Sequence, residues 1–395
     1  MKVLTCCLGC FLLLVAFSIV AINYNYKTTT YKKPTTYLKK PKKLTIPTEL
    51  KKYVDKDGFV STGDIDDMWI RDSTAQIWPF RKSHNILAQK ILAKQADYIK
   101  EDVYANSYRR KTKTSLTSYD KRLGRYGRVA TRNYELDSGA YFIRLLCALR
   151  DTRFEDVVQL LVDTWIIEQH HEDKSPYRYT ELSRNGLGTK TGYTGMTWTG
   201  FRPSDDKCIY HYLIPSNLFA VKVLRDVLKI FPNIIGASKL ADEIELGVRV
   251  YGTWTDDKGV IRYCYEVDGM GGCNRMDDAN LPSLLSIPYF DSSKFNDPIW
   301  KNTYDWVWSN SNPYFYKGTV ADGIGSPHTP KNYIWPLSLI TRGLVDPTKD
   351  TVMIDMLKRT STHGKLHESF DKDNFKKFTR EDFSWPNMLV KELVL

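Results

Sequence analysis

Hydrophobic residues after residue 45 recur three and four positions apart, which is the spacing of one face of an α-helix. The clearest patterns predict helices over 87–99, 141–149, 154–165, 218–231 and 240–248. Weaker patterns predict further helices near 279–287, 334–343, 351–359 and 380–394. Alternation over Val260–Val267 predicts a short hairpin. No strand–helix–strand rhythm and no GxGxxG motif occur, so the body is expected to be all-α and not a dinucleotide-binding fold.

The N-terminal 44 residues have a different pattern. Val3–Ile22 is a run of 20 residues without a charge, long enough to span a hydrocarbon core of about 30 Å. It is longer than the apolar region of a cleaved signal peptide, which favours a signal-anchor over a signal peptide in residues 1–22. Residues 23–44, rich in Thr, Lys and Pro, are expected to be an extended stem. Residues 45–395 then form the folded domain, and the orientation across the membrane stays open.

Charge and cysteine content narrow the function classes. The net charge is +11, but residues 1–44 contain eight Lys and no acid, which leaves +3 on the body. The body is therefore not expected to bind nucleic acid. The chain is 42% hydrophobic, too apolar for a disordered protein. Of seven Cys, four lie outside the apolar run. They could form two disulfides or remain buried thiols, and no CxxC spacing indicates zinc.

Six loops between the predicted helices combine aromatic residues with acids and Arg. They are 63–80, 134–138, 195–217, 265–282, 323–336 and 367–385. Solvated loops are usually rich in Lys, Ser and Gly instead. Aromatic faces can stack on sugar rings while carboxylates and Arg bind hydroxyl groups, so this composition indicates a carbohydrate site.

The same loops resemble one known family. The segment TGDIDDMWIRDSTAQIWP at residues 62–79 is similar to a signature of glycoside hydrolase family 125. Further matches keep the family's order over residues 58–394. They are YELDS at 134–138, GMTW at 195–198, FRPSDD at 201–206, LIPSN at 213–217, YEVDG at 265–269, MDDAN at 276–280, GIGSPHTP at 323–330, HESF at 367–370 and KFTRE at 377–381.

The resemblance implies an (α/α)6 barrel with active-site loops at one end. It implies an inverting, metal-independent exo-α-1,6-mannosidase without a cofactor. The substrate would be an oligosaccharide with terminal α-1,6-mannose, of the N-glycan or mannan type. The expected location is the secretory pathway, either secreted or anchored in the membrane through residues 3–22. Residues 100–133, especially Arg109–Arg132, are basic and match the family poorly.

By this resemblance, the general acid lies in Asp205-Asp206 and the general base is Glu368. Inverting hydrolysis needs one carboxylic acid to protonate the leaving oxygen and one carboxylate to activate water from the opposite face. The residues leave open which aspartate is the acid, and we favour Asp205. A helix N-cap is the alternative role for this Pro-Ser-Asp-Asp segment.

Further residues are candidates for binding substrate. Trp69, Arg71 and Asp72 are expected to form the wall of the terminal-mannose subsite, with a buried structural ion pair as the alternative. Other candidates for the pocket are Asp137, Arg202, Asp277, Asp278 and His328. Asp277 and Asp278 could instead cap the backbone before Asn280, and Trp198 and Trp335 could stack on sugar or fill the core. His363 and His367 have metal-ligand spacing, but a loop is expected there and no metal.

Two other functions remain open from the sequence. One is a barrel glycosidase of different sugar specificity, because a single epimeric hydroxyl separates mannose from glucose. The other is a membrane-tethered glycan-binding protein with weak catalysis. The presence of both candidate acids and Glu368 argues against the second.

Overall fold

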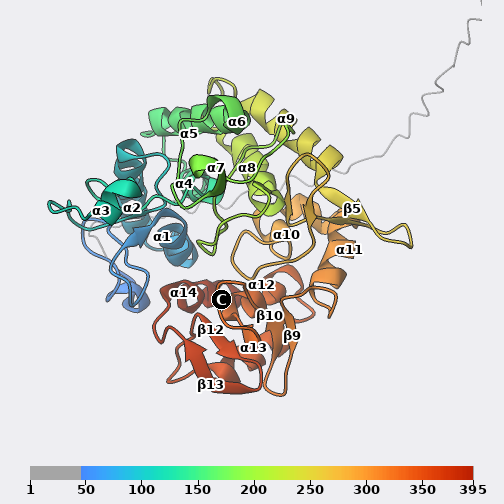
Figure 1. Ribbon diagram of the computed structural model, residues 1–395. Coiled ribbons are helices and arrows are strands. Elements are labelled where there is room, and N and C mark those ends of the chain that lie inside the picture. The colour runs from blue at the N-terminus through green and yellow to red at the C-terminus, as the bar shows by residue number, and fades with distance from the viewer. Residues whose placement is uncertain (1–45, 395) are drawn as a thin grey trace, which may run out of the picture. The chain divides into compact units, whose positions relative to one another are not determined.

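The computed structural model describes residues 46–394, and helices dominate this part of the chain (Figure 1). The α-helices are α1 Ile70–Ile77, α2 Asn85–Glu101, α3 Ser118–Arg122, α4 Leu136–Leu149, α5 Glu155–Glu168, α6 His171–Lys174, α7 Ser183–Gly186, α8 Ile214–Val227, α9 Ala237–Tyr251, α10 Ile287–Phe290, α11 Pro298–Val307, α12 Pro336–Val345, α13 Asp350–Thr360 and α14 Ser384–Val394. The 3-10 helices are η1 Thr48–Leu50, η2 Trp78–Phe80 and η3 Ser292–Asn296. The expected N-terminal span at 3–22 and the stem at 23–44 lie outside the described residues.

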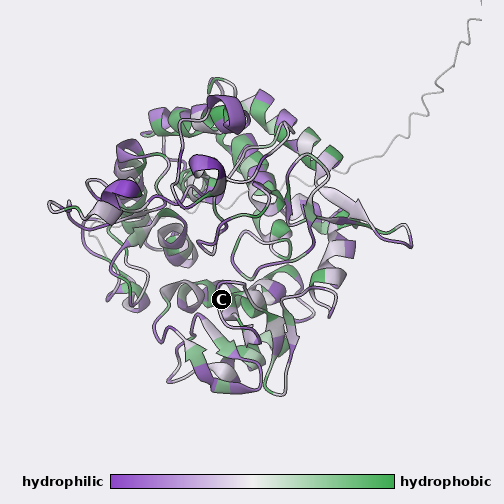
Figure 2. Ribbon diagram, in the orientation of Figure 1, coloured by the Kyte–Doolittle hydropathy of each residue, from purple (hydrophilic) through white to green (hydrophobic). Residues whose placement is uncertain are grey.

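Within residues 46–394, six helices pack in succession around a closed ring: α1, α4, α8, α10, α12, α14 and back to α1. Helices α2, α5, α9 and α13 pack on the outside of this ring, as Figure 1 shows. This two-layer arrangement is compatible with an α/α barrel. The hydrophobic core lies within the ring and between the layers, and the short helices α3 and α7 are mainly hydrophilic (Figure 2).

Short strands precede several ring helices. They form small antiparallel sheets, of which three have three strands: β1-β2-β3, β4-β7-β8 and β11-β12-β13. Their strands are β1 Met68–Trp69, β2 Ser107–Tyr108, β3 Val129–Thr131, β4 Tyr212–Leu213, β7 Glu266–Val267, β8 Cys273–Asn274, β11 Tyr333–Ile334, β12 Ser369–Asp371 and β13 Asn374–Thr379. The two-stranded sheets pair β5 Thr253–Thr255 with β6 Ile261–Tyr263, and β9 Phe315–Lys317 with β10 Asp322–Ile324. Because β1 runs directly into α1, β4 into α8 and β11 nearly into α12, these sheets gather at the N-terminal ends of ring helices.

All five strongly patterned helices occur where they were predicted, as α2, α4, α5, α8 and α9. The weaker predictions at 334–343, 351–359 and 380–394 correspond to α12, α13 and α14. The prediction of a loop over 63–80 is wrong, because residues 70–77 form α1. All eight residues of α1 are buried, polar ones included, so the helix has no solvent face to give it an amphipathic pattern.

Two other predictions were wrong in part. The predicted helix at 279–287 is absent except for the start of α10 at Ile287. Side chains there bond to the backbone instead: Asp277 accepts hydrogen bonds from the N–H groups of Leu284 and Leu285, which competes with helix formation. The predicted hairpin starts earlier than expected, because β6 pairs with β5 while β7 joins a different sheet.

Of the four cysteines outside the apolar run, two form a disulfide and two are free thiols. Cys264 and Cys273 form a disulfide that links the segment entering β7 to β8. Cys208 is a buried thiol and Cys147 a half-buried one. Among residues 46–394, no helix is both long enough and apolar enough to cross a membrane.

Candidate active site

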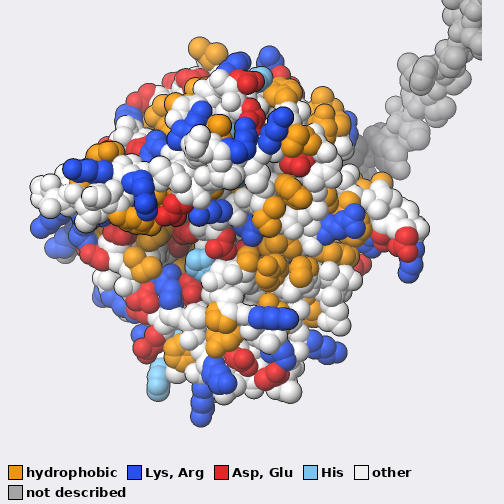
Figure 3. Space-filling model, viewed as in Figure 1, with side chains coloured by type: hydrophobic (Ala, Val, Ile, Leu, Met, Phe, Trp, Pro, Cys, Tyr) orange, Lys and Arg blue, Asp and Glu red, His pale blue; other side chains and the backbone are white. Residues whose placement is uncertain are grey.

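A cavity of about 210 Å³ lies at the strand-bearing end of the ring. Its walls come from parts of the chain that are far apart in sequence. The lining residues are Thr62, Ile65, Trp69, Arg71, Asp72, Pro203, Ser204, Asp205, Asn280, His328, Trp335, Glu368, Arg380, Phe383 and Trp385. Figure 3 shows acidic, basic and histidine side chains side by side near the middle of this face. Two candidate catalytic carboxyls, Asp205 and Glu368, thus line one cavity.

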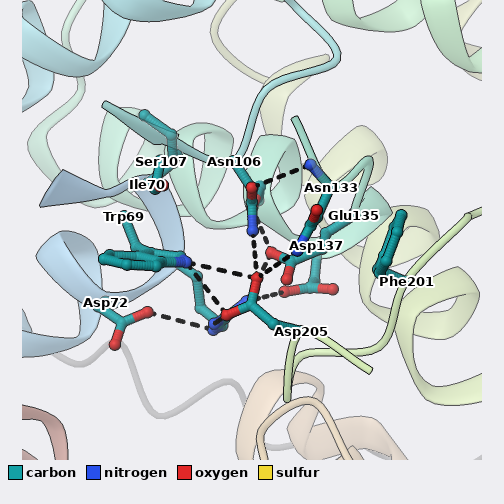
Figure 4. Close-up of polar contacts among 12 residues, drawn as sticks. Trp69, Ile70, Asp72, Asn106, Ser107, Asn133, Glu135, Asp137, Phe201 and Asp205 are labelled. Atoms are coloured by element: carbon teal, nitrogen blue, oxygen red, sulfur yellow. Dashed lines mark hydrogen bonds and ion pairs between the residues drawn. The ribbon is translucent and has the colours of Figure 1, made fainter. Parts of the chain in front are cut away.

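Asp205 is the most heavily hydrogen-bonded of the candidates (Figure 4). Its carboxylate accepts hydrogen bonds from Asn106 Nδ2 at 2.7 Å, Asn133 Nδ2 at 3.1 Å and Trp69 Nε1 at 3.2 Å. The amide of Asn106 is oriented by its own oxygen, which accepts from the backbone N–H of Asn133 and the hydroxyl of Thr131. Asp205 therefore has a fixed position at the edge of the cavity.

The loop around Asp205 is held by a tight turn. The N–H of Asp205 donates to Arg202 O at 2.9 Å, and the N–H of Arg202 donates to Asp206 O at 2.8 Å. Asp205 has φ +65°, a left-handed conformation that is uncommon for a residue with a side chain. Arg202 does not line the cavity: its buried guanidinium donates to Glu266 at 2.5 Å. Its contact to the site is thus through the backbone of this turn.

Arg71 lies behind Asp205 as a buried cation shared by several carboxylates. Its distances are 2.5 Å to Glu135, 3.3 Å to Asp72, 3.7 Å to Asp137 and 3.8 Å to Asp205. Burial opposes the charge of Arg71, but the carboxylates around it, Glu135 first, outweigh burial and raise its pKa. An Arg in this position is a fixed positive charge in the wall of the cavity.

The pKa values of the acids around Arg71 are raised as well, which favours their neutral forms. Burial raises the pKa of Asp72 and of Glu135 despite the nearby guanidinium. Burial also raises the pKa of Asp137 to about 7. Asp72 lines the cavity, whereas Asp137 is fully buried and accepts from the Ser216 hydroxyl at 3.4 Å. Asp72 is therefore available to a ligand and Asp137 supports Arg71 from behind.

Asp206 points toward His328. The imidazole Nδ1 lies 3.1 Å from Asp206 Oδ1, and the Ser204 hydroxyl donates to Asp206 at 3.1 Å. The hydrogen bond to Asp206 raises the pKa of His328 to about 9 against the opposing effect of burial, and Glu368 and Asp205 add to the rise. The pKa of about 9 favours the imidazolium form of His328 at neutral pH, paired with Asp206.

Glu368 is positioned by the hairpin of β12 and β13. The residue precedes β12, and its N–H donates to Thr379 O at 3.3 Å at the end of β13. Arg380 follows β13 and therefore lies beside Glu368, with 3.6 Å between Nη1 and Oε1. The same guanidinium donates to Asp64 and to Thr62 O. The hairpin thus attaches Glu368 to the loop that precedes α1.

Some predicted pocket residues lie outside the cavity. Asp277 is fully buried and bonds to backbone N–H groups, and burial raises its pKa to about 8. Asp278 is also fully buried, and it accepts from Asn280 Nδ2 at 2.9 Å and from the Ser326 hydroxyl at 3.0 Å. Both therefore occupy the capping role that was the alternative from sequence, although Asp278 also holds Asn280, which lines the cavity.

Of the two aromatic candidates, one lines the cavity and the other lies in the core. Trp335 lines the cavity and is anchored by a hydrogen bond from Nε1 to the Thr329 hydroxyl. Trp198 is fully buried and stacked on the His171 ring, 3.5 Å between centroids, so it belongs to the core. Asn106, Asn133, Asn280 and Trp385 were not proposed from sequence. A single Asn or Trp carries little local signal, and only the folded structure brings these side chains to the site.

A metal site was also considered. Among residues 46–394, no group of three or more His, Cys, Asp or Glu side chains is arranged to hold a metal ion. His363 is exposed, and His367 is buried against Phe378 with stacked rings 3.7 Å apart.

A second and larger cavity, of about 520 Å³, lies at the other end of the helices. Trp78, Arg144, Phe219 and Lys222 are among the residues that line it, near the C-terminal halves of α4 and α8. None of the residues predicted for the site lines this cavity. The smaller cavity is the one that contains the candidate catalytic carboxylates Asp205 and Glu368.

Comparison with known proteins agrees with this assignment. Residues 27–395 match the family model described as metal-independent α-mannosidase (GH125). The chain is 35% identical, over 388 residues, to the meiotically up-regulated gene 157 protein of Schizosaccharomyces pombe, covering 85% of this chain and 76% of that protein.

Solved structures give the same result. A metal-independent α-mannosidase from Streptococcus pneumoniae, solved as a non-productive complex with α-1,6-mannobiose, is 37% identical with a TM-score of 0.79, covering 87% of this chain and 89% of that one. A cellobiose 2-epimerase from Bacillus thermoamylovorans is 10% identical with a TM-score of 0.50, covering 88% and 96% of the two chains, and is similar in fold alone.

Proposed function

The chain belongs to the GH125 family of metal-independent α-mannosidases, and from that premise we propose that it is an inverting exo-α-1,6-mannosidase. It would remove non-reducing terminal mannose from N-glycan or mannan-type oligosaccharides. The ring of helices and its outer layer would be an (α/α)6 barrel that carries the catalytic loops at one end. The α-1,6 linkage is supported by the mannobiose bound to the S. pneumoniae relative.

One observation carries this proposal: Asp205 and Glu368, distant in sequence, line the same cavity. Inversion needs two carboxyl groups on opposite faces of a sugar ring with room for water between them. The cavity of about 210 Å³ is smaller than the roughly 300–1,000 Å³ of sites for drug-sized ligands. It therefore suits a single terminal sugar, as exo-action requires.

In this mechanism, Glu368 takes a proton from water as the water oxygen bonds to the anomeric carbon. The bond from that carbon to the leaving oxygen breaks, and Asp205 gives its proton to that oxygen. We assign the acid to Asp205 because its side chain lines the cavity with Glu368. Asp206 would keep His328 protonated beside them.

The remaining walls would recognise the sugar. Asp72 and the guanidinium of Arg71 line the cavity and offer an acceptor and donors for hydroxyl groups. Trp69, Trp335 and Trp385 offer apolar ring surface for the sugar CH groups. Selectivity for mannose over glucose would depend on which of these groups meets the axial hydroxyl.

The test is proton NMR of an α-1,6-mannobioside during hydrolysis. We expect free mannose to appear first as the β-anomer and then to mutarotate. Initial α-mannose would reject inversion. Release of glucose alone from the matching α-1,6-linked glucoside would favour the barrel glycosidase of other specificity, and binding without turnover would favour the glycan-binding protein.

We further propose a location in the secretory pathway, secreted or anchored through residues 3–22. The Cys264–Cys273 disulfide supports this, because such bonds persist in oxidising compartments. Fractionation of cells that express the whole chain, with protease protection of intact vesicles, tests it. Recovery of the protein in the cytosol would contradict it.

A further inference from the structure

The segment between β2 and β3, residues 109–128, is an unusually basic loop beside the active site. It contains eight Lys or Arg residues and one acid, Asp120, and carries the short helix α3. The body as a whole has only a small net charge, so this basic loop is a local concentration of positive charge. Figure 3 shows blue side chains over the region of α3, on the same face as the cavity.

The basic loop is attached to the site at its base. It extends from β2 and β3, which belong to the same three-stranded sheet as β1. Asn106 precedes β2 and Asn133 follows β3, and both amides hold the Asp205 carboxylate. Any group bound on the basic loop is therefore connected to the catalytic aspartate through short, hydrogen-bonded segments.

The far side of the basic loop is linked to the catalytic turn indirectly, through Glu181. The Tyr119 hydroxyl donates to Glu181 at 3.1 Å. Lys207 donates to the Glu181 backbone carbonyl at 3.0 Å, and Lys207 directly follows Asp206 in the chain. The basic loop is thus connected to the site through β2 and β3 on one side and through Glu181 on the other.

Ion pairs with Asp120 and with acids outside the loop neutralise only part of the loop's charge. Lys113 lies 2.7 Å from Asp120, and Arg128 lies 2.6 Å from Glu101. Within residues 46–394, Lys111, Lys121 and Arg125 form no ion pair. Residues 1–44 contain no Asp or Glu side chain to supply a partner. These three cations are consequently available to an anionic ligand.

Exposed aromatic rings lie among these cations. Tyr119 is 46% exposed and Tyr126 is 54% exposed. The guanidinium groups of Arg122 and Arg125 lie 5.1 and 5.2 Å from the Tyr119 ring centre. A tyrosine face can stack on a sugar while neighbouring guanidinium groups bind phosphate oxygens in pairs. Groups suited to sugar and to anion recognition therefore lie together on this loop.

We propose that the basic loop binds a phosphate group on the leaving-group side of the substrate, so that the preferred substrate is a phosphorylated mannooligosaccharide. This inference rests on the proposed mannosidase activity and specifies its substrate class. The sugar-sized tyrosine faces and the connections to Asp205 through Asn106 and Asn133 favour a phosphorylated glycan over a phospholipid surface. Lys111, Lys121 and Arg125 supply the charge, and Tyr119 supplies the sugar contact.

The experiment compares kcat/KM for α-1,6-mannobiose and for the same disaccharide with a phosphate on its reducing-end C1. We expect wild-type protein to prefer the phosphorylated substrate about tenfold at low salt, and the preference to shrink in about 1 M NaCl. In the triple variant Lys111→Gln, Lys121→Gln and Arg125→Gln, the ratio should fall to near one. A wild-type ratio near one overturns the proposal.

The matched control changes the same charge elsewhere: Lys258→Gln, Lys301→Gln and Lys358→Gln are exposed lysines far from the basic loop in sequence. This variant should keep the preference. Loss of the preference in both triple variants overturns the proposal. The preference would then come from the overall positive charge of the protein and not from the basic loop. Sedimentation with vesicles containing phosphatidylserine tests the lipid source. Vesicle binding that depends on the three loop residues, without a substrate preference, also overturns it.

The two proposals can fail separately. If wild-type protein hydrolyses neither disaccharide, the mannosidase assignment fails. Calorimetry of the same protein with the two disaccharides then decides the loop proposal. Tighter binding of the phosphorylated one, lost in the loop variant, supports it, and equal binding overturns it.

Discussion

Arg380 Nη1 lies 3.6 Å from Glu368 Oε1, and the same side chain donates to Asp64 Oδ1 at 2.9 and 2.6 Å. Arg380 thus connects a residue near the C-terminal end of the chain to the loop before α1. The Arg380–Glu368 ion pair lies on the side of the site where the last ring helix, α14, packs against the first, α1. Arg380 does not have to touch substrate for this effect, and we regard it as a positioning residue for Glu368.

Replacing Arg380 should therefore reduce turnover more than substrate binding. In Arg380→Gln we expect kcat to fall about tenfold, because the ion pair is lost and the carboxylate is held less well. Arg380→Lys should recover part of the loss, since it keeps the charge but not the paired donors to Asp64. Steady-state kinetics on a mannobioside measure both constants. A rise in KM with kcat unchanged would instead assign Arg380 to substrate binding.

Glu368→Gln should lower kcat by about 10²–10⁴-fold, the usual contribution of a general base, while mannobiose binding is retained. Glutamine keeps the shape of the side chain but cannot take a proton from water. The matched control is Glu381→Gln, an exposed glutamate close in sequence. Kinetics together with calorimetry provide the measurement. Wild-type turnover in Glu368→Gln would remove this residue from the mechanism.

Asp205→Asn and Asp206→Asn should respond differently to the leaving group. A good leaving group needs no protonation, so the variant that lacks the acid should lose much less activity on an activated aryl α-mannoside than on mannobiose. We expect this behaviour from Asp205→Asn. Asp206→Asn should lose similar activity on both substrates through its effect on His328. The reverse pattern would make Asp206 the acid.

The His328–Asp206 pair should make stability depend on pH. The pKa of His328 rises from 6.5 to about 9 on folding, chiefly through the hydrogen bond to Asp206. The unfolded chain loses this proton first as pH rises, so the stabilisation is complete below pH 6.5 and disappears as pH passes 9. The difference in unfolding free energy between wild type and His328→Gln should shrink over that range.

Urea denaturation at a series of pH values measures this difference. The control is His363→Gln, which removes an exposed histidine that makes no hydrogen bond or ion pair with the described residues. Its effect should not vary in the same window. A constant difference for His328→Gln from pH 6 to pH 10 would contradict the assigned ion pair.

Asp277→Ala should destabilise the fold rather than impair substrate binding. The side chain accepts hydrogen bonds from two buried backbone N–H groups at 2.8 and 3.0 Å. Leaving these donors without partners should lower the unfolding free energy by about 2–4 kcal/mol. Thermal denaturation measures the loss, with Asp305→Ala as an exposed control. A large rise in KM with an unchanged melting temperature would return Asp277 to the sugar site.

The helix predictions depended on amphipathic patterns, and their outcome follows burial. Helix α2 has one buried and one exposed side, so its spacing was visible in the chain. Helix α1 is buried on every side and was taken for a loop. Segment 279–286 shows the opposite error, because Asp277 and the serines there bond to the backbone in place of a helix.

The residue order alone identified the family and the segments that carry Asp205, Asp206 and Glu368, because those motifs are long and contiguous. The sequence could not predict the distances between these segments. Folding brings Glu368 to Asp205, aims Asp206 at His328, turns Asp277 into the backbone and gathers Asn106, Asn133 and Trp385 at the site. Local sequence restricts backbone conformation over a few residues only, whereas closure of a helical ring decides which distant side chains share a cavity.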